Sequence, residues 1–455
     1  MNVLHVPFCF YPDPVGGTEV YVQNLGLEQK HLGLEASIAA PGTSEQKYAH
    51  EGLDVRRFPG GRSTNLLELY GAGEPSAAEA FARILDTVRP DLVHLHALTA
   101  ATSLLLVEAV QRAGLPIVYT YHTPTASCPR GTLMRWGKQL CDGRMDLRRC
   151  SACAAHAQGA PRGLAELIGA VPAGAGRTLG NLGLSGGPWT ALRTTELLRL
   201  RQGTFREVMR RVDRIVSLCS WTTELLQRNG IPADKITLSR HGLRSSEMRP
   251  AGDDPGASPV GENGCRMAFL GRVNPTKGLS VLVQAISADP TLKLTLDIYG
   301  VVQGPGEKAY RETLEKGLDE RIRFREPLAS SEVVEALGGY DLLAVPSQWL
   351  ETGPLVVLEA FAAGIPVIGS DLGGIRELVR HDVDGLLLPP ASVPAWTASL
   401  RRLTTHCGLL SRLRAGVKPP RTMRTVAEQM ASLYEDVLEK KARCLSGPVG
   451  AIAKR

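Results

Sequence analysis

SQWLETGPLVVLEAFAAGIPVIGSD, residues 347–371, is the most informative stretch of this 455-residue chain. Pro354 is well placed as the first residue of a helix and Gly364 as its terminating residue, because proline favours helix starts and glycine favours helix ends. The apolar runs at 341–346 and 366–370 predict a strand on each side of this helix. The stretch therefore predicts a strand, a helix of about ten residues and a second strand, the repeating unit of a parallel α/β sheet.

The same alternation of short apolar runs and helical patterns extends over the whole chain. In the first half, strands are predicted at 2–6, 36–40, 91–96, 116–121 and 214–219, with helices near 18–32, 76–88, 98–113 and 221–229. In the second half, further strands are predicted at 267–270, 292–299, 321–324 and 384–389. The fold class is therefore α/β, with two Rossmann-like, doubly wound domains that face a central cleft.

Composition shifts suggest where the domains begin and end. Residues 249–264, RPAGDDPGASPVGENG, are rich in Pro, Gly and Asp and predict a linker. The linker separates an N-terminal domain, 1–248, from a C-terminal domain, 265–420, and the last helical pattern covers 421–441. The first domain contains an irregular insertion at 123–212 without a strong strand pattern, and a connection of that length is usually functional or mobile.

Charge and composition exclude several classes of protein. Apolar residues make up 43% and charged residues 22% of the chain, which excludes a disordered protein. The net charge of +6 is modest, and the basic residues do not alternate with aromatic ones, so no nucleic-acid partner is expected. The first residues have no basic n-region, and the nine cysteines are an odd number, which favours a reducing, cytoplasmic location.

A cysteine cluster lies in the insertion. Four of the nine cysteines fall within 26 residues, namely Cys128, Cys141, Cys150 and Cys153, and the last two form a C-x-x-C pair. Four thiolates suit a tetrahedral structural zinc site, in which His122 or His156 could replace one thiol. An iron–sulfur cluster and unliganded thiols are the alternatives.

The end of the insertion is basic. Arginines alternate with leucines between Arg177 and Arg214, as in ALRTTELLRLRQGTFREVMRRVDRI. A basic amphipathic helix could rest on the anionic inner face of a membrane, which would suit a lipid-linked acceptor. The alternative is a solvated helix that packs through its leucines.

Polar residues follow the predicted strands of the second half, where open α/β sheets bind ligands. After the strand at 267–270, Gly271 allows a tight turn, and Arg272 and Lys277 can converge on one anion such as a pyrophosphate. Glu351 and Glu359 can each accept hydrogen bonds from the hydroxyls of one ligand. The alternative reading is a pair of solvated cations and an acidic helix start.

Backbone amides supply a second kind of anion site. The helix that begins near Pro354 exposes amides at Gly353 and Leu355, where its positive end would hold a phosphate. In PDPVGGTEVYV of the first half, Gly16 and Gly17 let the backbone approach a ligand, although an ordinary turn would also explain them.

Together these motifs resemble the retaining glycosyltransferases of family 4, also described as glycosyl transferases group 1. The resemblance rests on the glycine pair, on Gly-Arg and Lys after the first strand of the second half, and on a Glu, seven residues and a second Glu that run into EAFAAGIPVIGSDLGGIREL. It implies the GT-B fold, a nucleotide sugar bound mainly by the C-terminal domain, and a final helix that crosses back to the first domain.

The resemblance also implies roles for single residues. Arg272 and Lys277 would hold the diphosphate, Glu351 sugar hydroxyls and Glu359 the ribose, with backbone amides from Gly353 through Pro354 to Leu355 completing the site. Gly16 and Gly17 would approach the phosphates from the acceptor side, and His122 would lie near the sugar and the acceptor. Thr352 to Pro354 depart from the Phe-Gly that many members have after the first Glu, which weakens any inference about the sugar.

The implied reaction is a hexosyltransferase-type transfer without a catalytic cofactor, of the kind used in polysaccharide biosynthesis. Its partners would be a nucleotide-diphosphate sugar and a glycan, lipid-linked or small-molecule acceptor, and the leaving diphosphate would help to deprotonate the acceptor hydroxyl in a front-face displacement. The alternatives are a nucleotide-sugar 2-epimerase of the same fold and a nucleotide-sugar-binding protein without transfer activity.

Overall fold

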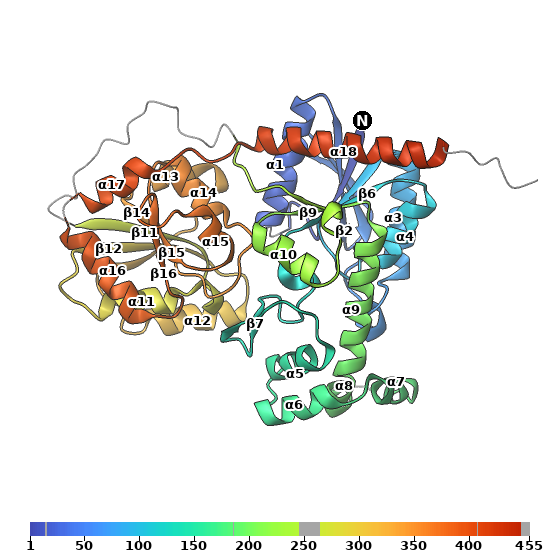
Figure 1. The fold of residues 1–455 in the computed structure, drawn as a ribbon, viewed down its shortest axis with the longest axis horizontal. Helices are drawn as coiled ribbons and strands as arrows, with labels where there is room; N and C mark the ends of the chain where they lie inside the picture. The colour runs from blue at the N-terminus through green and yellow to red at the C-terminus, as the bar shows by residue number, and fades with distance from the viewer. Residues whose placement is uncertain (14–15, 185, 245–263, 407, 447–455) are drawn as a thin grey trace, which may run out of the picture. The chain divides into compact units, whose positions relative to one another are not determined.

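A computed structural model describes residues 1–13, 16–184, 186–244, 264–406 and 408–446 of the chain. The chain forms two compact units (Figure 1). Unit 1 contains Met1–Arg240 and the chain from Arg424 onward, and unit 2 contains His241–Met423. The linker predicted at 249–264 lies outside the described residues except for Gly264.

Unit 1 is built on an eight-stranded sheet with the order β10-β9-β6-β5-β1-β2-β4-β3. All neighbours are parallel except β3 and β4. The five predicted strands are present as β1 (Asn2–Val6), β2 (Glu35–Gly42), β5 (Leu92–Leu95), β6 (Ile117–Tyr121) and β9 (Arg214–Ser217). Three strands were not predicted, namely β3 (Gln46–His50), β4 (Leu53–Pro59) and β10 (Ile236–Leu238).

Four of the helices in the described part of unit 1 lie at predicted positions, namely α1 (Gly17–His31), α3 (Pro75–Val88), α4 (Leu104–Arg112) and α10 (Ser220–Arg228). Helix α2 (Leu66–Tyr70) was not predicted. The last helix, α18 (Met423–Ser446), also packs on unit 1, where Gln429 Nε2 donates to the Leu238 carbonyl at 3.2 Å. Strand β1 thus lies in the middle of the sheet, with α1 and α18 contributing side chains to its surroundings.

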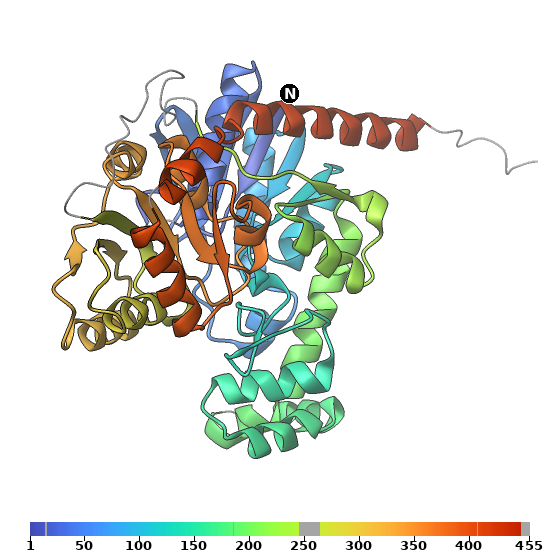
Figure 2. The same cartoon turned by 60° about the vertical axis from the view of Figure 1, so that its left-hand side comes forward.

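The insertion connects β6 to β9 and is mainly helical from Leu147 onward. It contains a short 3-10 turn, η1 (Pro124–Ala126), the two-residue strands β7 (Met134–Arg135) and β8 (Gln139–Leu140), and the helices α5 (Leu147–Ala157), α6 (Arg162–Ala170), α7 (Ala173–Asn181), α8 (Gly187–Leu192) and α9 (Thr194–Arg211). Helices α5 to α8 gather around the first turns of α9, away from the sheet of unit 1 (Figure 2).

Unit 2 has a six-stranded, fully parallel sheet with the order β13-β12-β11-β14-β15-β16. All six predicted strands are present, as β11 (Cys265–Arg272), β12 (Leu294–Val301), β13 (Ile322–Arg325), β14 (Leu342–Val345), β15 (Val367–Ser370) and β16 (Gly385–Leu388). Both faces of the sheet are buried, one under α11 (Leu279–Ser287), α16 (Val393–Thr405) and α17 (Leu409–Gly416), the other under α13 (Val333–Leu337), α14 (Leu355–Ala362) and α15 (Gly373–Leu378).

The strand order of unit 2 reverses between β11 and β14. In open α/β sheets such a reversal opens a crevice at the carboxyl ends of the two strands, where ligands bind. Helix α14, which follows β14, has eight residues and is shorter than predicted. Pro354 is its N-cap with extended backbone, so the prediction that it is the first helical residue was wrong by one position.

No helix within the described part of the chain has the length and apolar character needed to cross a lipid bilayer.

Candidate functional site

The loops after β11 and β14 are joined at the reversal point of unit 2. The backbone N–H of Gln348 donates to the carbonyl of Thr276 at 2.7 Å. Gly278 has a φ of +75°, and a Cβ at this position would lie 1.9 Å from the carbonyl oxygen of Pro346. Only glycine allows this approach, because any side chain would push the two loops apart.

This junction positions Lys277 against Glu351. Lys277 Nζ lies 2.9 Å from Glu351 Oε1, and the Ser347 hydroxyl contacts the same oxygen. Glu351 is buried, so its charge needs this compensation. Lys277 Nζ also lies 5.7 Å from the ring centroid of Trp349, within cation–π range. The structure therefore brings together two of the predicted site residues and adds Ser347 and Trp349 to them.

Arg272 ends β11 but contacts a different carboxylate. Its guanidinium forms an ion pair with Glu307 in the first turn of α12 (Pro305–Glu315). Glu307 also accepts from Asn274 Nδ2 at 3.2 Å and from the Gln303 N–H at 2.7 Å. Burial acts to raise the pKa of Glu307, but these hydrogen bonds and Arg272 together hold that pKa below its usual value. Arg272 and Lys277 were predicted to converge on one anion, and here each holds its own carboxylate.

The loop between Glu351 and α14 is fixed by two further glycines. Gly353 has a φ of +152°, and a Cβ there would lie 2.9 Å from His241 Cδ2. The N–H of Gly374, in the first turn of α15, donates to the Glu351 carbonyl at 2.7 Å. Pro354 and Leu355 follow at the helix start, and Glu359 lies one turn inside α14 on a partly exposed face.

Unit 1 has its own cavity, of about 440 Å³, at the carboxyl ends of β5 and β6. Its polar lining includes Thr18, Glu19, His96, His122, Thr123 and Arg201. Gly16 precedes α1 and donates its N–H to Glu19 Oε2 at 2.9 Å, while Gly17 is the first helical residue. Neither glycine lines the cavity, but together they place Glu19 in its wall, where burial raises the pKa of that carboxyl.

His122 is the end of a buried chain of histidines. Its Nε2 lies 3.0 Å from His96 Nδ1, and His96 Nε2 lies 3.0 Å from His5 Nδ1. The chain continues from His5 Nε2 to Gln29 Oε1, 2.7 Å away. Beside it, His94 lies 2.7 Å from both Thr120 Oγ1 and the Tyr434 hydroxyl of α18.

Three of these histidines lie close enough together to resemble a metal site. Among the described residues, His5, His94 and His96 are the one group of His, Cys, Asp or Glu whose ligand atoms all lie within 4.8 Å of one another. Burial lowers the pKa of His5 to about 4 and holds the pKa values of His94 and His96 well below 6.5, so all three are neutral at pH 7. A neutral imidazole has one donor and one acceptor, and hydrogen bonds already use both on each ring, so these rings form a network rather than a metal site.

The four clustered cysteines come from three segments of the insertion. Cys128 follows η1, Cys141 follows β8, and Cys150 and Cys153 lie on α5, whose N-cap Asp146 accepts the Arg149 N–H at 2.7 Å. No disulfide joins any of the four. Burial raises the pKa of Cys150 to about 12, and Cys141, Cys128 and Cys153 act in the same direction, so these three thiols lie near Cys150.

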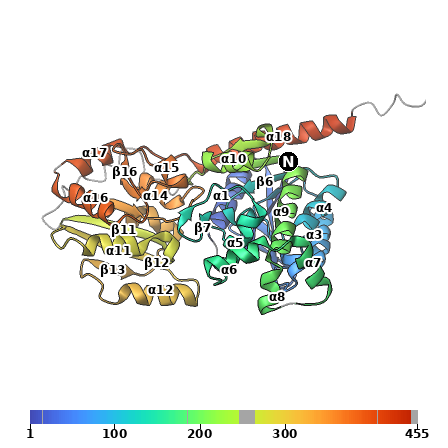
Figure 3. The same ribbon diagram turned by 60° about the horizontal axis from the view of Figure 1, so that its bottom comes forward.

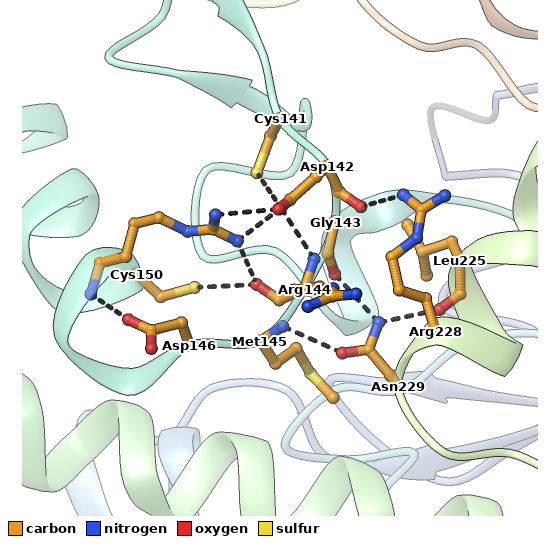
Figure 4. Close-up of polar contacts among 11 residues, drawn as sticks. Cys141, Asp142, Gly143, Arg144, Met145, Asp146, Cys150, Leu225, Arg228 and Asn229 are labelled. Carbon is orange, nitrogen blue, oxygen red and sulfur yellow. Dashed lines mark hydrogen bonds and ion pairs between the residues drawn. The ribbon is translucent and has the colours of Figure 1, made fainter.

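Two of the thiols are engaged with their local backbone and side chains. Figure 4 shows Cys141 directed at Asp142 and Cys150 directed at the Arg144 carbonyl, with sulfur to oxygen distances of 3.8 and 3.9 Å. The predicted substitute ligands are also engaged, since His122 contacts His96 and His156 Nδ1 lies 2.8 Å from the Ala160 carbonyl. The cysteines are therefore neighbours whose sulfurs are not gathered at ligand spacing.

Two family models match the chain. The model described as Glycosyltransferase Family 4 matches residues 15–174, and the model described as Glycosyl transferases group 1 matches residues 254–415. A curated relative, the D-inositol 3-phosphate glycosyltransferase of Corynebacterium glutamicum, is 36% identical over 184 residues, which are 38% of this chain and 43% of the relative. The protein of the same name from Thermobispora bispora is 30% identical over 256 residues, 52% of this chain and 59% of the relative. The chain thus spans about half the length of the curated relatives it matches.

Solved structures match over nearly the full chain. Sucrose-phosphate synthase from Thermosynechococcus elongatus superposes with a TM-score of 0.67 at 17% identity, covering 97% of this chain and all of that one. HepE of Anabaena, solved in complex with UDP, superposes with a TM-score of 0.61 at 17% identity, covering 96% of this chain and all of that one. At 17% sequence identity, these similarities show that the chain shares the fold of these proteins.

Proposed function

The chain belongs to glycosyltransferase family 4 and has the GT-B fold, and on this premise we propose that it transfers a sugar from a nucleotide-diphosphate sugar to an acceptor hydroxyl with retention of configuration. The observation that carries the proposal is the Lys277–Glu351 pair, 2.9 Å apart, at the reversal point of the unit 2 sheet. A cation, a buried carboxylate and a helix start at one reversal point of the sheet match the charge pattern of a sugar diphosphate.

The donor diphosphate would compete for the two cations of unit 2. Its oxygens would draw Lys277 from Glu351 and Arg272 from Glu307, because a diphosphate carries more charge than one carboxylate. The carboxylate of Glu351 would then accept hydrogen bonds from sugar hydroxyls, and Glu359 would bind the ribose. In this account the two ion pairs keep the empty site electrically balanced until the donor enters.

The proposed transfer is a front-face displacement. The bond from the anomeric carbon to the diphosphate oxygen breaks, and the bond from the acceptor oxygen to the same carbon forms on the same face. The acceptor proton passes to the departing phosphate, so the reaction draws on no cofactor. Lys277 and Arg272 stabilise the charge that grows on the leaving group, a contribution that is large in a site with little water.

The cavity of unit 1 is proposed as the acceptor site. Its wall combines a cation, a carboxylate and an imidazole from Arg201, Glu19 and His122. These groups suit a polyhydroxylated acceptor, and Arg201 suits one that carries an anionic group. D-inositol 3-phosphate, which appears in the names of the curated relatives, is therefore the first acceptor to test.

Thermal shift and product analysis test the function together. UDP, GDP, ADP and their sugar conjugates are screened for a rise in melting temperature, since a ligand of the native state stabilises it. We expect one nucleotide to raise the melting temperature and its sugar conjugate to yield a glycosylated inositol phosphate or glycan. No shift with any of them would overturn the donor site. Free sugar released without an acceptor would favour a 2-epimerase, and binding without turnover a binding protein.

A structural zinc ion is proposed for Cys128, Cys141, Cys150 and Cys153. The support is chemical, because four thiols without disulfides lie in a single insertion, and three of them are near Cys150. Zinc would deprotonate them and draw Cys141 from Asp142 and Cys150 from the Arg144 carbonyl. Such thiols persist in a reducing compartment, so we propose that the protein acts in the cytoplasm.

A further inference from the structure

The positive charge of the chain is concentrated in the insertion. Residues 123–212 contain 14 basic and 5 acidic side chains, a net charge of +9, whereas the rest of the chain has a net charge of −3. Seven of the basic side chains in the insertion are exposed and form no ion pair with any described residue, namely Lys138, Arg144, Arg148, Arg162, Arg177, Arg199 and Arg206. This charge would attract an anionic partner to the insertion more strongly than to the rest of the chain.

The same segment exposes large apolar side chains. Of the eleven large hydrophobic residues exposed in the described chain, five lie in the insertion. Leu164 and Leu167 of α6 are 52% and 70% exposed, Leu182 after α7 is 68% exposed, and Trp189 of α8 is 43% exposed. These four residues, with Arg162 and Arg177, are called here the outer surface of the insertion.

Helix α6 shows why these leucines are not core residues. Its Ala165, Ile168 and Gly169 are buried, and a Cβ on Gly169 would lie 2.7 Å from the Arg148 carbonyl of α5. The face of α6 that carries these three residues therefore packs closely against α5. Leu167 is rotated by about 100° or more around the helix axis from each of these three residues, and it is 70% exposed. Figure 3 shows α6, α7 and α8 together on the side of unit 1 turned toward the viewer.

The apolar side of α9 has a different role. Its Leu197, Leu198, Phe205, Val208 and Met209 are all buried. Of the two sequence interpretations of the arginine- and leucine-rich segment, α9 agrees with the helix that packs through its apolar side chains, and not with a helix that itself rests on a membrane. The exposed apolar residues lie instead on the helices gathered around its first turns.

We propose that the outer surface of the insertion docks reversibly on an anionic lipid bilayer. Arg162 and Arg177 would contact lipid phosphates, while the leucines and Trp189 enter the interfacial region, where amphipathic aromatic rings are favoured. Residues 147–192 contain four arginines and a single acidic residue, Glu166, which suits an anionic surface. A second copy of the chain fits less well, because a two-fold contact through this surface would place the arginines of one copy against those of the other.

Vesicle co-sedimentation tests the proposal with the full chain and needs no enzymatic activity, so it fails or succeeds separately from the proposed function. The vesicles contain either phosphatidylcholine alone or equal parts of phosphatidylcholine and phosphatidylglycerol. We expect binding to the anionic vesicles only, and a steep loss of binding as salt is added.

Two double variants remove either the charged or the apolar side chains of the outer surface of the insertion. Arg162→Gln/Arg177→Gln should lower the partition coefficient on anionic vesicles by about tenfold or more, because each arginine near such a surface contributes about fivefold. Leu164→Ser/Leu167→Ser should lower it as well, and at high salt should remove what binding remains.

Control variants change exposed residues of the same types outside the outer surface of the insertion. Leu67→Ser changes a leucine of α2 that is 53% exposed, and Lys308→Gln/Lys316→Gln removes two exposed charges from unit 2. Both should bind vesicles like the parent, and all variants should keep its melting temperature. Equal binding by the surface variants and the parent, or no binding to anionic vesicles, would overturn the proposal. So would self-association that the surface variants abolish, because it would identify a protein interface.

Discussion

At the scale of residues, the site of unit 2 depends on a short-range balance of charge. Glu351 is buried, and Lys277 and Ser347 are the contacts that make its burial tolerable. In the proposed mechanism Lys277 is already ordered by its ion pair with Glu351, so little side-chain entropy would be lost when it turns to the donor diphosphate.

Lys277→Ala should lower kcat/KM for sugar transfer by about a hundredfold, because one charge that stabilises the leaving group is lost. The variant also removes the Lys277 ion pair from the buried Glu351, so we expect a loss of stability of about 1–3 kcal/mol. Lys308→Ala, an exposed lysine of α12, is the control and should change neither quantity. Parent-like transfer by Lys277→Ala would count against the proposed mechanism.

Sequence reasoning identified part of this site and could not identify the rest. Lys277 and Glu351 follow strands whose carboxyl ends meet, so their proximity follows from topology alone. Glu307 was missed because it begins a helix after the neighbouring strand β12, and no motif marks it. The available sequence signal was an acidic residue near the start of a helix that follows a strand. The structure shows that this residue pairs with Arg272.

At the scale of elements, one face of the unit 1 sheet carries imidazoles where apolar side chains are the rule. His5 of β1 is the direct register partner of His94 of β5, and His96 follows two residues later on the same face. The alternation H-x-H in the predicted strand at 91–96 was the sequence signal for this face, and its meaning required knowing that β1, β5 and β6 are neighbours.

The buried histidines predict that stability falls in mild acid. His5 has a pKa of about 4 when folded and about 6.5 when unfolded, so between these values the unfolded chain binds a proton that the folded chain does not. Its contribution is complete above pH 6.5 and is lost as the pH falls toward 4, by roughly 2 kcal/mol at pH 5. Urea unfolding at pH 7, 6 and 5 measures this slope.

The comparison variant is His5→Gln. In this variant the change of unfolding free energy with pH should correspond to nearly one proton fewer than in the parent. His31→Gln changes an exposed histidine of α1 and should leave this pH dependence unaltered. A slope that is identical in the parent and His5→Gln would show that His5 is not the group that titrates.

The cysteine cluster leads to a metal prediction at the same scale. Protein purified without chelators should contain about one zinc ion per chain, and removal of the ion should lower the melting temperature of the insertion, because metal binding to such sites is coupled to folding. Cys150→Ser/Cys153→Ser should lose the zinc, whereas Cys9→Ser should keep it. A zinc content near zero with all four thiols open to titration would eliminate the site.

Two of the strands that sequence reasoning missed, β3 and β4, carry polar side chains. Strand β3 is an exposed antiparallel edge strand with the polar sequence QKYAH, and β4 contains two arginines. Predictions from apolar runs find strands that are buried on both faces, as those of unit 2 are. They cannot find a strand that exists because a neighbouring strand offers it hydrogen bonds.

At the scale of the whole molecule, α18 ties the end of the described chain to the core of unit 1. Tyr434 is fully buried, and its hydroxyl lies 2.7 Å from His94 Nδ1 and 3.2 Å from Gln29 Nε2. Residues more than 300 positions apart in sequence therefore share one hydrogen-bond network.

Tyr434→Phe should destabilise the protein by about 1–3 kcal/mol, because it leaves buried polar atoms of His94 and Gln29 without their partner. Urea unfolding at pH 7 gives the value, and Glu435→Gln, an exposed neighbour on α18, is the control. A loss no larger than that of Glu435→Gln would mean that the network contributes little.

The division of the chain into units has a consequence for biosynthesis. Unit 2 is one continuous stretch, whereas unit 1 needs α18, which follows unit 2 in the chain. A ribosome that adds roughly 5–20 residues per second releases the sheet of unit 1 first, and Tyr434 reaches His94 only after all of unit 2 has been made. During that interval the nascent sheet carries its histidines without their last partner, so unit 1 is the first part to emerge and the last to be completed.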